Sequence, residues 1–181
     1  MRISVLTASL PEREAFRAEA IASVNAQTFA PIAHLIAVDH ERVGPAEILN
    51  RLLPAAVSMD AEWVALLADD DVLYPQHLEV LVACESGDIR YSYCDVEGRG
   101  GWSPNAPFDP DRLRRENYIP ATTLIRTELA VTLGWNVDAA NGWEDYDFWL
   151  RALDVGAEFA CVPQVTWLYR FHGSNHSTRG R

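Results

Sequence analysis

The chain has 181 residues, of which 49% are apolar, and its formal net charge at pH 7 is −11. This length and apolar content suffice for one domain with a substantial core, and they exclude a disordered protein. The acidic charge argues against nucleic acid or an anionic membrane surface as a partner, because binding to either would need an excess of basic groups.

The first half of the chain alternates between strand patterns and helix patterns. Apolar strands are predicted at residues 2–8, 33–38, 63–68 and 89–94. Helices are predicted between them, at residues 16–27, after Gly44 and Pro45, and from Pro75 onward. This alternation predicts an α/β fold with a mostly parallel sheet, in which ligands bind beyond the carboxyl ends of the strands. No GxGxxG motif follows the first strand, which argues against a nicotinamide or flavin site.

The second half of the chain is less regular. Residues 97–111 contain three glycines and three prolines, which predicts a long mobile loop. The elements expected after it are a strand, two helices and two strands, at residues 122–125, 126–133, 143–155, 159–162 and 165–171. The last two strands are separated at Pro163, and a frayed polar tail is expected from Gly173. Because no repeat and no second domain are evident, we expect a single domain over residues 1–181.

Three consecutive carboxylates, Asp69, Asp70 and Asp71, follow the third predicted strand. Charges about 4 Å apart repel by roughly 4 kcal/mol at an effective dielectric constant of 20, so packing them requires a cation. Mg²⁺ or Mn²⁺, bridging these oxygens to substrate phosphates, is the natural partner. The alternative is a solvated acidic turn that caps the helix beginning at Pro75. A second acidic cluster at residues 144–147 favours the metal.

All fifteen basic residues are arginine. The absence of lysine excludes a Schiff-base enzyme and a P-loop, so bound phosphates would need a metal, Arg, His or backbone amides. The three cysteines are scattered and odd in number, which predicts buried free thiols in a reducing compartment. No apolar run approaches the roughly 20 residues needed to span a bilayer, and no signal peptide precedes the first strand. We therefore expect a cytoplasmic protein.

Six motifs stand in an order that is found in a known enzyme family. They are an opening strand at 3–9, a helix with Ser and Gln-Thr at 20–28, Asp39 together with Gly44 and Asn50, a DXD-like region at 67–75, an acidic helix at 143–151 and a closing segment at 169–172. In these features the chain resembles the family 2 glycosyltransferases, which carry the GT-A fold. It departs from the family at Ala68, where the first Asp of Asp-x-Asp-Asp is usual, and at His40, where a second Asp is usual.

The resemblance implies a metal-dependent, inverting enzyme that moves a sugar from a nucleotide diphosphate sugar, here a UDP sugar, to a hydroxyl acceptor. The acceptor would be a saccharide, a protein or another hydroxyl compound. Residues 1–95 would hold the nucleotide sugar, residues 96–181 would shape the acceptor side, and the loop at 97–111 would close over the donor.

The resemblance also assigns roles around the metal. Asp70 would be the metal ligand, with Asp69 at the variable position and Asp71 as the trailing acid; Asp69 and Asp71 also satisfy the bare DXD motif, so the choice of pair stays open. His172 would complete the metal site, and Arg170 would contact a phosphate. An exposed histidine and a strand-end arginine are the alternative interpretations.

On the nucleotide side, Asp39 could accept a hydrogen bond from the N3–H of uracil, which favours UDP sugars. Its alternative role is that of a turn residue at a strand end. Thr7 and Arg13 flank the expected base pocket, where ordinary loop roles are equally open. Trp102 and Trp135 could stack on a sugar, but the sequence does not distinguish this role from that of buried tryptophans or loop anchors.

The resemblance makes Asp145 the candidate general base, and this residue lies in the first turn of its helix beside Trp143 and Tyr146. These rings would raise the pKa of Asp145 toward neutral pH by desolvation. The alternative is an acidic first turn that interacts with the helix dipole, worth about 0.3–1 kcal/mol. Glu144 would orient the acceptor or the metal.

Two other functions stay open. A non-catalytic module that binds a sugar nucleotide or a carbohydrate would use the same scaffold, and Ala68 favours it. A nucleotidyltransferase would share the metal carboxylates, but it would be expected to activate a triphosphate with a basic residue such as lysine, which this chain lacks.

Overall fold

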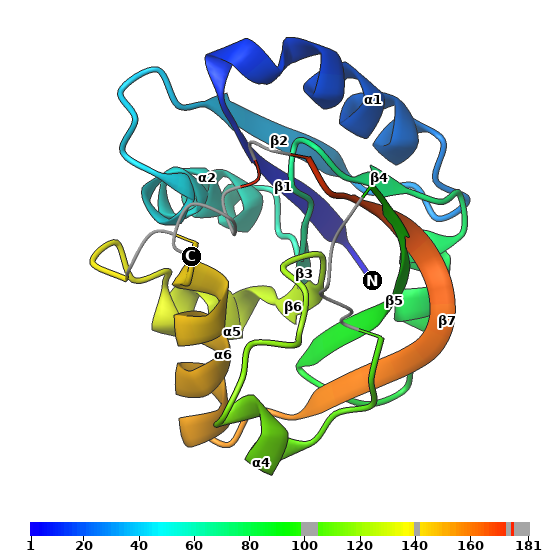
Figure 1. Cartoon of the computed structure of the whole chain (residues 1–181), viewed down its shortest axis with the longest axis vertical. Coiled ribbons are helices and arrows are strands. Elements are labelled where there is room, and N and C mark those ends of the chain that lie inside the picture. Colours follow the sequence, from blue (N-terminus) through cyan, green and yellow to red (C-terminus); the bar gives the residue numbers. More distant parts are fainter. Residues whose placement is uncertain (99–104, 140–141, 173–174, 176–181) are drawn as a thin grey trace.

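The computed structural model describes residues 1–98, 105–139, 142–172 and 175. Within them, the strands form one mixed sheet in the order β2-β1-β3-β6-β5-β7-β4 (Figure 1). The strand bounds are β1 Ile3–Ser9, β2 Ala33–Val38, β3 Trp63–Leu66, β4 Val72–Leu73, β5 Ile89–Glu97, β6 Leu124–Arg126 and β7 Phe159–Arg170. β1 is parallel to β2 and β3, and β5 is parallel to β7. β6 runs antiparallel between β3 and β5, and β4 pairs antiparallel with β7.

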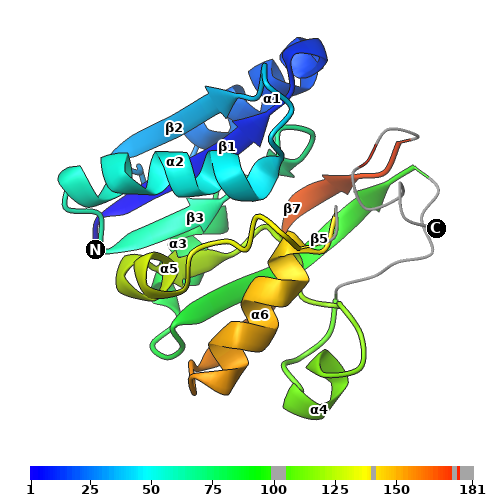
Figure 2. The same cartoon turned by 90° about the vertical axis from the view of Figure 1, so that its left-hand side faces the viewer.

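Helices cover both faces of this sheet (Figure 2). The helix bounds are η1 Pro11–Arg13, α1 Glu14–Asn25, α2 Pro45–Ser58, α3 His77–Ala83, α4 Pro110–Leu113, α5 Thr127–Leu133 and α6 Glu144–Asp154, where η1 is a single 3₁₀ turn. α2, α5 and α6 lie on one face, and α1 and α3 lie on the other. Alternate strand residues separate the two cores, since Leu6 packs toward α2 whereas Val5 packs toward α1 and α3.

The predicted alternation of strands and helices is confirmed, and most bounds agree within about two residues. One difference is β7, where two strands were expected. Pro163 lies at a shift in the register with β5, between Val162 and Val165, so the strand continues across it without a ladder bond from the proline nitrogen. A second difference is α3, which begins at His77, because Pro75 belongs to the preceding turn.

Two short elements were not expected. β4 has two residues and α4 has four, too few for a periodic pattern to show. The loop expected at 97–111 ends in the first residues of α4, and residues 99–104 of that loop, with Trp102, lie outside the described residues. The polar tail expected from Gly173 also lies outside them, apart from Asn175.

Two further expectations concern the cysteines and the membrane. Cys84, Cys94 and Cys161 are free thiols, as predicted, although only Cys94 is fully buried. Among the described helices, none combines the length and the apolar character that crossing a bilayer requires.

The topology brings several polar residues to one edge of the sheet. β1, β2 and β3 run in the same direction, so η1, Asp39 and the acidic residues after β3 all follow the carboxyl ends of neighbouring strands. α6 runs back from this side of the sheet toward the start of β7, so its first turn lies on the same side (Figure 2).

Candidate functional site

The acidic turn after β3 is buried. Asp69, Asp70 and Asp71 are 2%, 6% and 4% exposed, so the interpretation as a solvated acidic turn is wrong. The turn is closed by a hydrogen bond from the backbone N–H of Asp71 to the carbonyl of Ala68. Three carboxylates that are removed from water in consecutive positions need compensating charge and hydrogen bonds from elsewhere in the fold.

Arg13 supplies part of that charge. Its Nη1 donates to Asp69 Oδ1 at 2.8 Å and to Asp70 Oδ2 at 2.9 Å, and the backbone N–H of Leu10 donates to Asp69 Oδ2 at 3.1 Å. Burial acts to lower the pKa of Arg13, but the charges of Asp70 and Asp69 outweigh it and raise that pKa. Sequence analysis placed Arg13 near a base pocket and did not anticipate its contact with the acidic turn.

Asp70 and His172 meet although 102 positions separate them in the sequence. His172 Nε2 lies 3.0 Å from Asp70 Oδ2, and the His172 ring stacks on Phe16 with their centroids 5.0 Å apart. Asp71 fixes the end of β7, two residues before His172, because its Oδ1 accepts from the backbone N–H of Arg170 at 3.1 Å. Burial and the neighbouring Asp70 charge raise the pKa of Asp71 well above its usual range.

The side chains of Asp70 and His172 could act together as metal ligands. No group of three or more His, Cys, Asp and Glu side chains in the described part of the chain is arranged to hold a metal. Asp70 and His172 instead offer one carboxylate oxygen and one imidazole nitrogen that face each other. Mg²⁺ or Mn²⁺ is commonly held by one or two protein ligands together with substrate phosphates and water. The pair therefore fits an ion bridged to a substrate, and it does not fit an all-protein cage.

Arg170 is held beside this pair. Its Nε donates to Glu97 Oε2 at 3.0 Å and its Nη2 to Glu19 Oε2 at 2.7 Å, while its guanidinium carbon lies 5.1 Å from the centroid of the Phe16 ring. Its third nitrogen, Nη1, is buried and has no hydrogen-bond partner among the described residues. A buried donor without an acceptor is costly, so this position favours an anionic oxygen from a ligand.

The second acidic cluster opens α6. Asp145 Oδ1 accepts from Asn117 Nδ2 at 3.2 Å and from the backbone N–H of Tyr146 at 2.7 Å. Burial, with a smaller contribution from the Glu144 charge, raises the pKa of Asp145 to about 7, which agrees with the predicted rise. Glu144 Oε2 accepts from the backbone N–H of Gly142 at 2.9 Å. Trp143 is 48% exposed and therefore faces solvent beside this acid.

One segment connects the two acidic clusters. Asn117 donates to Asp145, and Thr122, five positions later, places its hydroxyl 3.5 Å from Asp71 Oδ2. Five residues span at most about 18 Å even when fully extended. The segment therefore ties both acids to one region of the molecule. Asn117 and Thr122 were missed by sequence reasoning, because nothing in the pattern of residues 114–123 predicts these contacts.

The raised pKa of Asp145 predicts a pH-dependent stability. Because the folded pKa exceeds the ordinary value of 3.8, the folded protein holds this proton more tightly than the unfolded chain. The free energy of unfolding therefore falls as pH rises from about 4 to about 7. Asp145→Asn removes this penalty of about 4 kcal/mol, and we expect Tm to rise by roughly 8–16 °C at pH 8 and by less toward pH 4.

Thermal unfolding of wild type, Asp145→Asn and Asp147→Asn across this pH range checks the prediction. Asp147 is a matched control, because it lies on the same helix and pairs with Arg151 at 2.6 Å near the surface. A gain of the same size at pH 4 and pH 8 would show that the Asp145 charge is not the cause.

The nucleotide-side candidates are held inside the fold. Thr7 is fully buried, and its hydroxyl lies 2.9 Å from His34 Nε2 on the neighbouring strand. The two Asp39 oxygens accept from the backbone N–H groups of Val43 and Gly44 at 3.0 and 2.8 Å. Asp39 therefore acts as a turn residue before α2, with a second lone pair remaining on each oxygen. Trp135, a possible sugar platform, is buried against Phe148.

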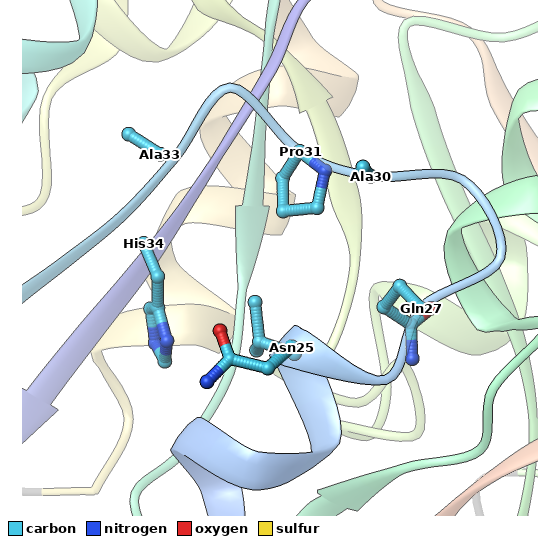
Figure 3. Close-up of a pocket in the computed structure, with 7 residues that line it drawn as sticks. Asn25, Gln27, Ala30, Pro31, Ala33 and His34 are labelled. Carbon is cyan, nitrogen blue, oxygen red and sulfur yellow. The ribbon is translucent and has the colours of Figure 1, made fainter.

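A cavity of about 280 Å³ lies beside His34, the partner of Thr7 (Figure 3). It is lined by Val24, Asn25, Gln27, Ala30, Pro31, Ala33 and His34. It lies between the end of α1 and the start of β2, whereas Asp39 follows the opposite end of β2. Burial lowers the pKa of His34 to about 4, so its imidazole is neutral there. The cavity is separate from the acidic turn.

Comparison with known proteins bears on the fold. The sequence matches no protein-family profile and no curated protein sequence. Among solved structures, the chain is similar to S. aureus TarS 1–349 in complex with UDP-GlcNAc, with a TM-score of 0.78 and 15% identity over all of this chain and 62% of that one. The corresponding complex with UDP gives 0.70, with 15% identity over 94% of this chain and 61% of that one.

Full TarS gives a TM-score of 0.72 and 15% identity, over 94% of this chain and 37% of that one. The present chain thus spans about three fifths of TarS 1–349. At this level of identity the likeness establishes the fold, which is an α/β fold of the kind found in TarS.

Proposed function

We propose that the chain is a glycosyltransferase of the family 2 type with a GT-A fold, which transfers a sugar from a UDP sugar to a hydroxyl acceptor with inversion. The observation that carries the proposal is the meeting of Asp70 and His172 at 3.0 Å beyond the end of β3. The similar fold of TarS, solved with UDP and with UDP-GlcNAc, supports the choice of donor. The free thiols support a cytoplasmic location.

Asp70 and His172 would hold the divalent ion, Mn²⁺ or Mg²⁺. When bound, such an ion supplies positive charge that offsets the charge developing on the leaving diphosphate. Asp71 would serve this site by anchoring the end of β7, and Arg170 would direct its unpartnered Nη1 at a phosphate oxygen. Thr7, Asp39 and Asp69 would form the nucleotide side, with Asp39 accepting from the uracil N3–H.

Asp145 would act as the general base. A carboxylate with a pKa of about 7 can accept the proton of an acceptor hydroxyl near neutral pH, and it would do so as that oxygen attacks the anomeric carbon. The bond to the diphosphate breaks as the new glycosidic bond forms, so a single displacement inverts the anomeric centre. Glu144, held by the backbone of Gly142, would orient the acceptor.

A thermal-shift screen of UDP, GDP and ADP, each with Mn²⁺ or with a chelator, tests this function. A ligand at 100 times its Kd stabilises a protein by about 2.7 kcal/mol, which corresponds to roughly 5–10 °C here. We expect this shift for UDP with Mn²⁺ and little shift in the other combinations. A donor-hydrolysis assay then separates a transferase from a non-catalytic module that binds UDP sugars without turnover. The absence of any nucleotide shift would contradict the proposal.

A further inference from the structure

The oxygen that we propose as a metal ligand is already shared by two nitrogen donors. Asp70 Oδ2 accepts from Arg13 Nη1 at 2.9 Å and lies 3.0 Å from His172 Nε2. The same Arg13 nitrogen also reaches Asp69 Oδ1 at 2.8 Å. Of their side-chain surfaces alone, Asp69 exposes 3%, Asp70 8% and Arg13 11%, so the two carboxylates are buried and the guanidinium is largely covered. The Arg13 guanidinium thus already occupies, as a cation, the position next to Asp70 where the divalent ion is expected to bind.

A divalent ion and the Arg13 guanidinium would repel each other if both bound Asp70 Oδ2. Two cations that share one carboxylate oxygen lie within a few ångströms of each other, and a buried setting screens their repulsion weakly. An ion that binds alone must therefore displace Arg13 from Asp70, which would break one of the two ion pairs that Arg13 makes with this turn. Such an ion would bind weakly unless Arg13 found a new anionic partner.

We propose that Arg13 is a counter-cation that moves between two anions: Asp69 and Asp70 in the free protein, and the diphosphate of the donor in the complex. This inference rests on the proposed function and deepens it. The guanidinium fork suits phosphate oxygens, and η1 places Arg13 directly after the carboxyl end of β1, beside the turn that follows β3. When the metal binds Asp70, Arg13 would lose this carboxylate, and the diphosphate of the donor would replace it as the anionic partner of Arg13.

The consequence is that metal and nucleotide bind cooperatively. Binding of the diphosphate removes Arg13 from Asp70 and favours the ion, and by thermodynamic linkage the ion favours the diphosphate by the same factor. Among the described residues, the nearby Arg17 and Arg170 do not share this arrangement. Arg17 donates to Ser9 Oγ and to the Leu10 carbonyl, and Arg170 pairs with Glu19 and Glu97.

Titration calorimetry of Mn²⁺ without nucleotide, and of UDP at saturating Mn²⁺, tests the proposal on wild type, Arg13→Gln, Arg13→Lys and Arg17→Gln. For Arg13→Gln we expect Mn²⁺ alone to bind about tenfold more tightly, and UDP about tenfold more weakly. Arg13→Lys keeps the competing charge and loses the planar fork, so Mn²⁺ binding should match wild type while UDP binding weakens. Arg17→Gln, which removes an equal charge from α1, should change neither affinity.

Unchanged or weaker binding of Mn²⁺ to Arg13→Gln would overturn the proposal and would leave Arg13 as a support for the acidic turn. If Arg13→Gln is too unstable for calorimetry, thermal unfolding decides the same question. Mn²⁺ without nucleotide should then raise its Tm more than that of wild type, and an equal or smaller rise would count against the idea. Failure of wild type to bind UDP would refute the proposed function instead, because competition between Mn²⁺ and Arg13 is measured without nucleotide.

Discussion

Asp145→Asn is expected to lower kcat for sugar transfer by about 10²–10⁴-fold, which is the usual contribution of a general base. The affinity of this variant for UDP should stay within about twofold of wild type. The amide keeps an oxygen that can accept from Asn117 and from the backbone of Tyr146, so the first turn of α6 should stay in place. It cannot accept the proton of the attacking hydroxyl. Initial rates with a saturating UDP sugar and calorimetry with UDP measure the two quantities.

The pH profile adds a second readout. A base works only when it is deprotonated, so kcat of wild type should rise with pH and level off above about 7, the pKa of Asp145. This rise should be absent from the residual rate of Asp145→Asn. Asp147→Asn, two residues further along the same helical turn and paired with Arg151, should keep both the wild-type rate and the profile. Full activity of Asp145→Asn would refute the assigned base.

Asp70→Asn is expected to weaken binding of UDP in the presence of Mn²⁺ by at least about 100-fold, because even outer-sphere partners of a metal are worth 10–100-fold in its affinity. The substitution removes the negative charge from the carboxylate whose Oδ2 lies 3.0 Å from His172 Nε2. His172→Ala should produce a smaller loss, and the double variant should lose less than the sum of the two free energies, because both act through the same ion.

Asp88→Asn is a suitable control for this series. Asp88 precedes β5 at the opposite end of the sheet and pairs with Arg126 at 3.2 Å near the surface. The Asp88→Asn variant should bind UDP and Mn²⁺ with wild-type affinity. Calorimetry at several Mn²⁺ concentrations measures these affinities, and wild-type binding by Asp70→Asn would exclude this aspartate as a ligand of the ion.

The fold was largely predictable because its strands are apolar and separated by helix patterns. β2 has the predicted bounds, and β1, β3 and α6 differ from prediction by one or two residues. β4 was not predictable, since two residues show no periodicity and its pairing with β7 joins distant parts of the chain. The continuation of β7 past Pro163 depends on a register shift against β5, which a single strand's sequence does not reveal.

The site was predictable where it follows strand ends and unpredictable where it depends on side-chain direction. Asp70 lies in the turn that follows β3, and the resemblance supplied His172 as a further residue of the same metal site. The contact of Arg13 with the acidic turn could have been inferred, since η1 and that turn follow neighbouring parallel strands. The Asn117–Asp145 contact could not, because the irregular segment that carries Asn117 is positioned only by tertiary packing.

The central claim is that a divalent ion between Asp70 and His172 holds the diphosphate of a UDP sugar within reach of Asp145. Anomalous scattering from Mn²⁺ in crystals grown with UDP tests it most directly. We expect one strong peak in contact with Asp70 Oδ2, His172 Nε2 and a diphosphate oxygen. A peak elsewhere, or UDP bound in the cavity beside His34, would contradict the account.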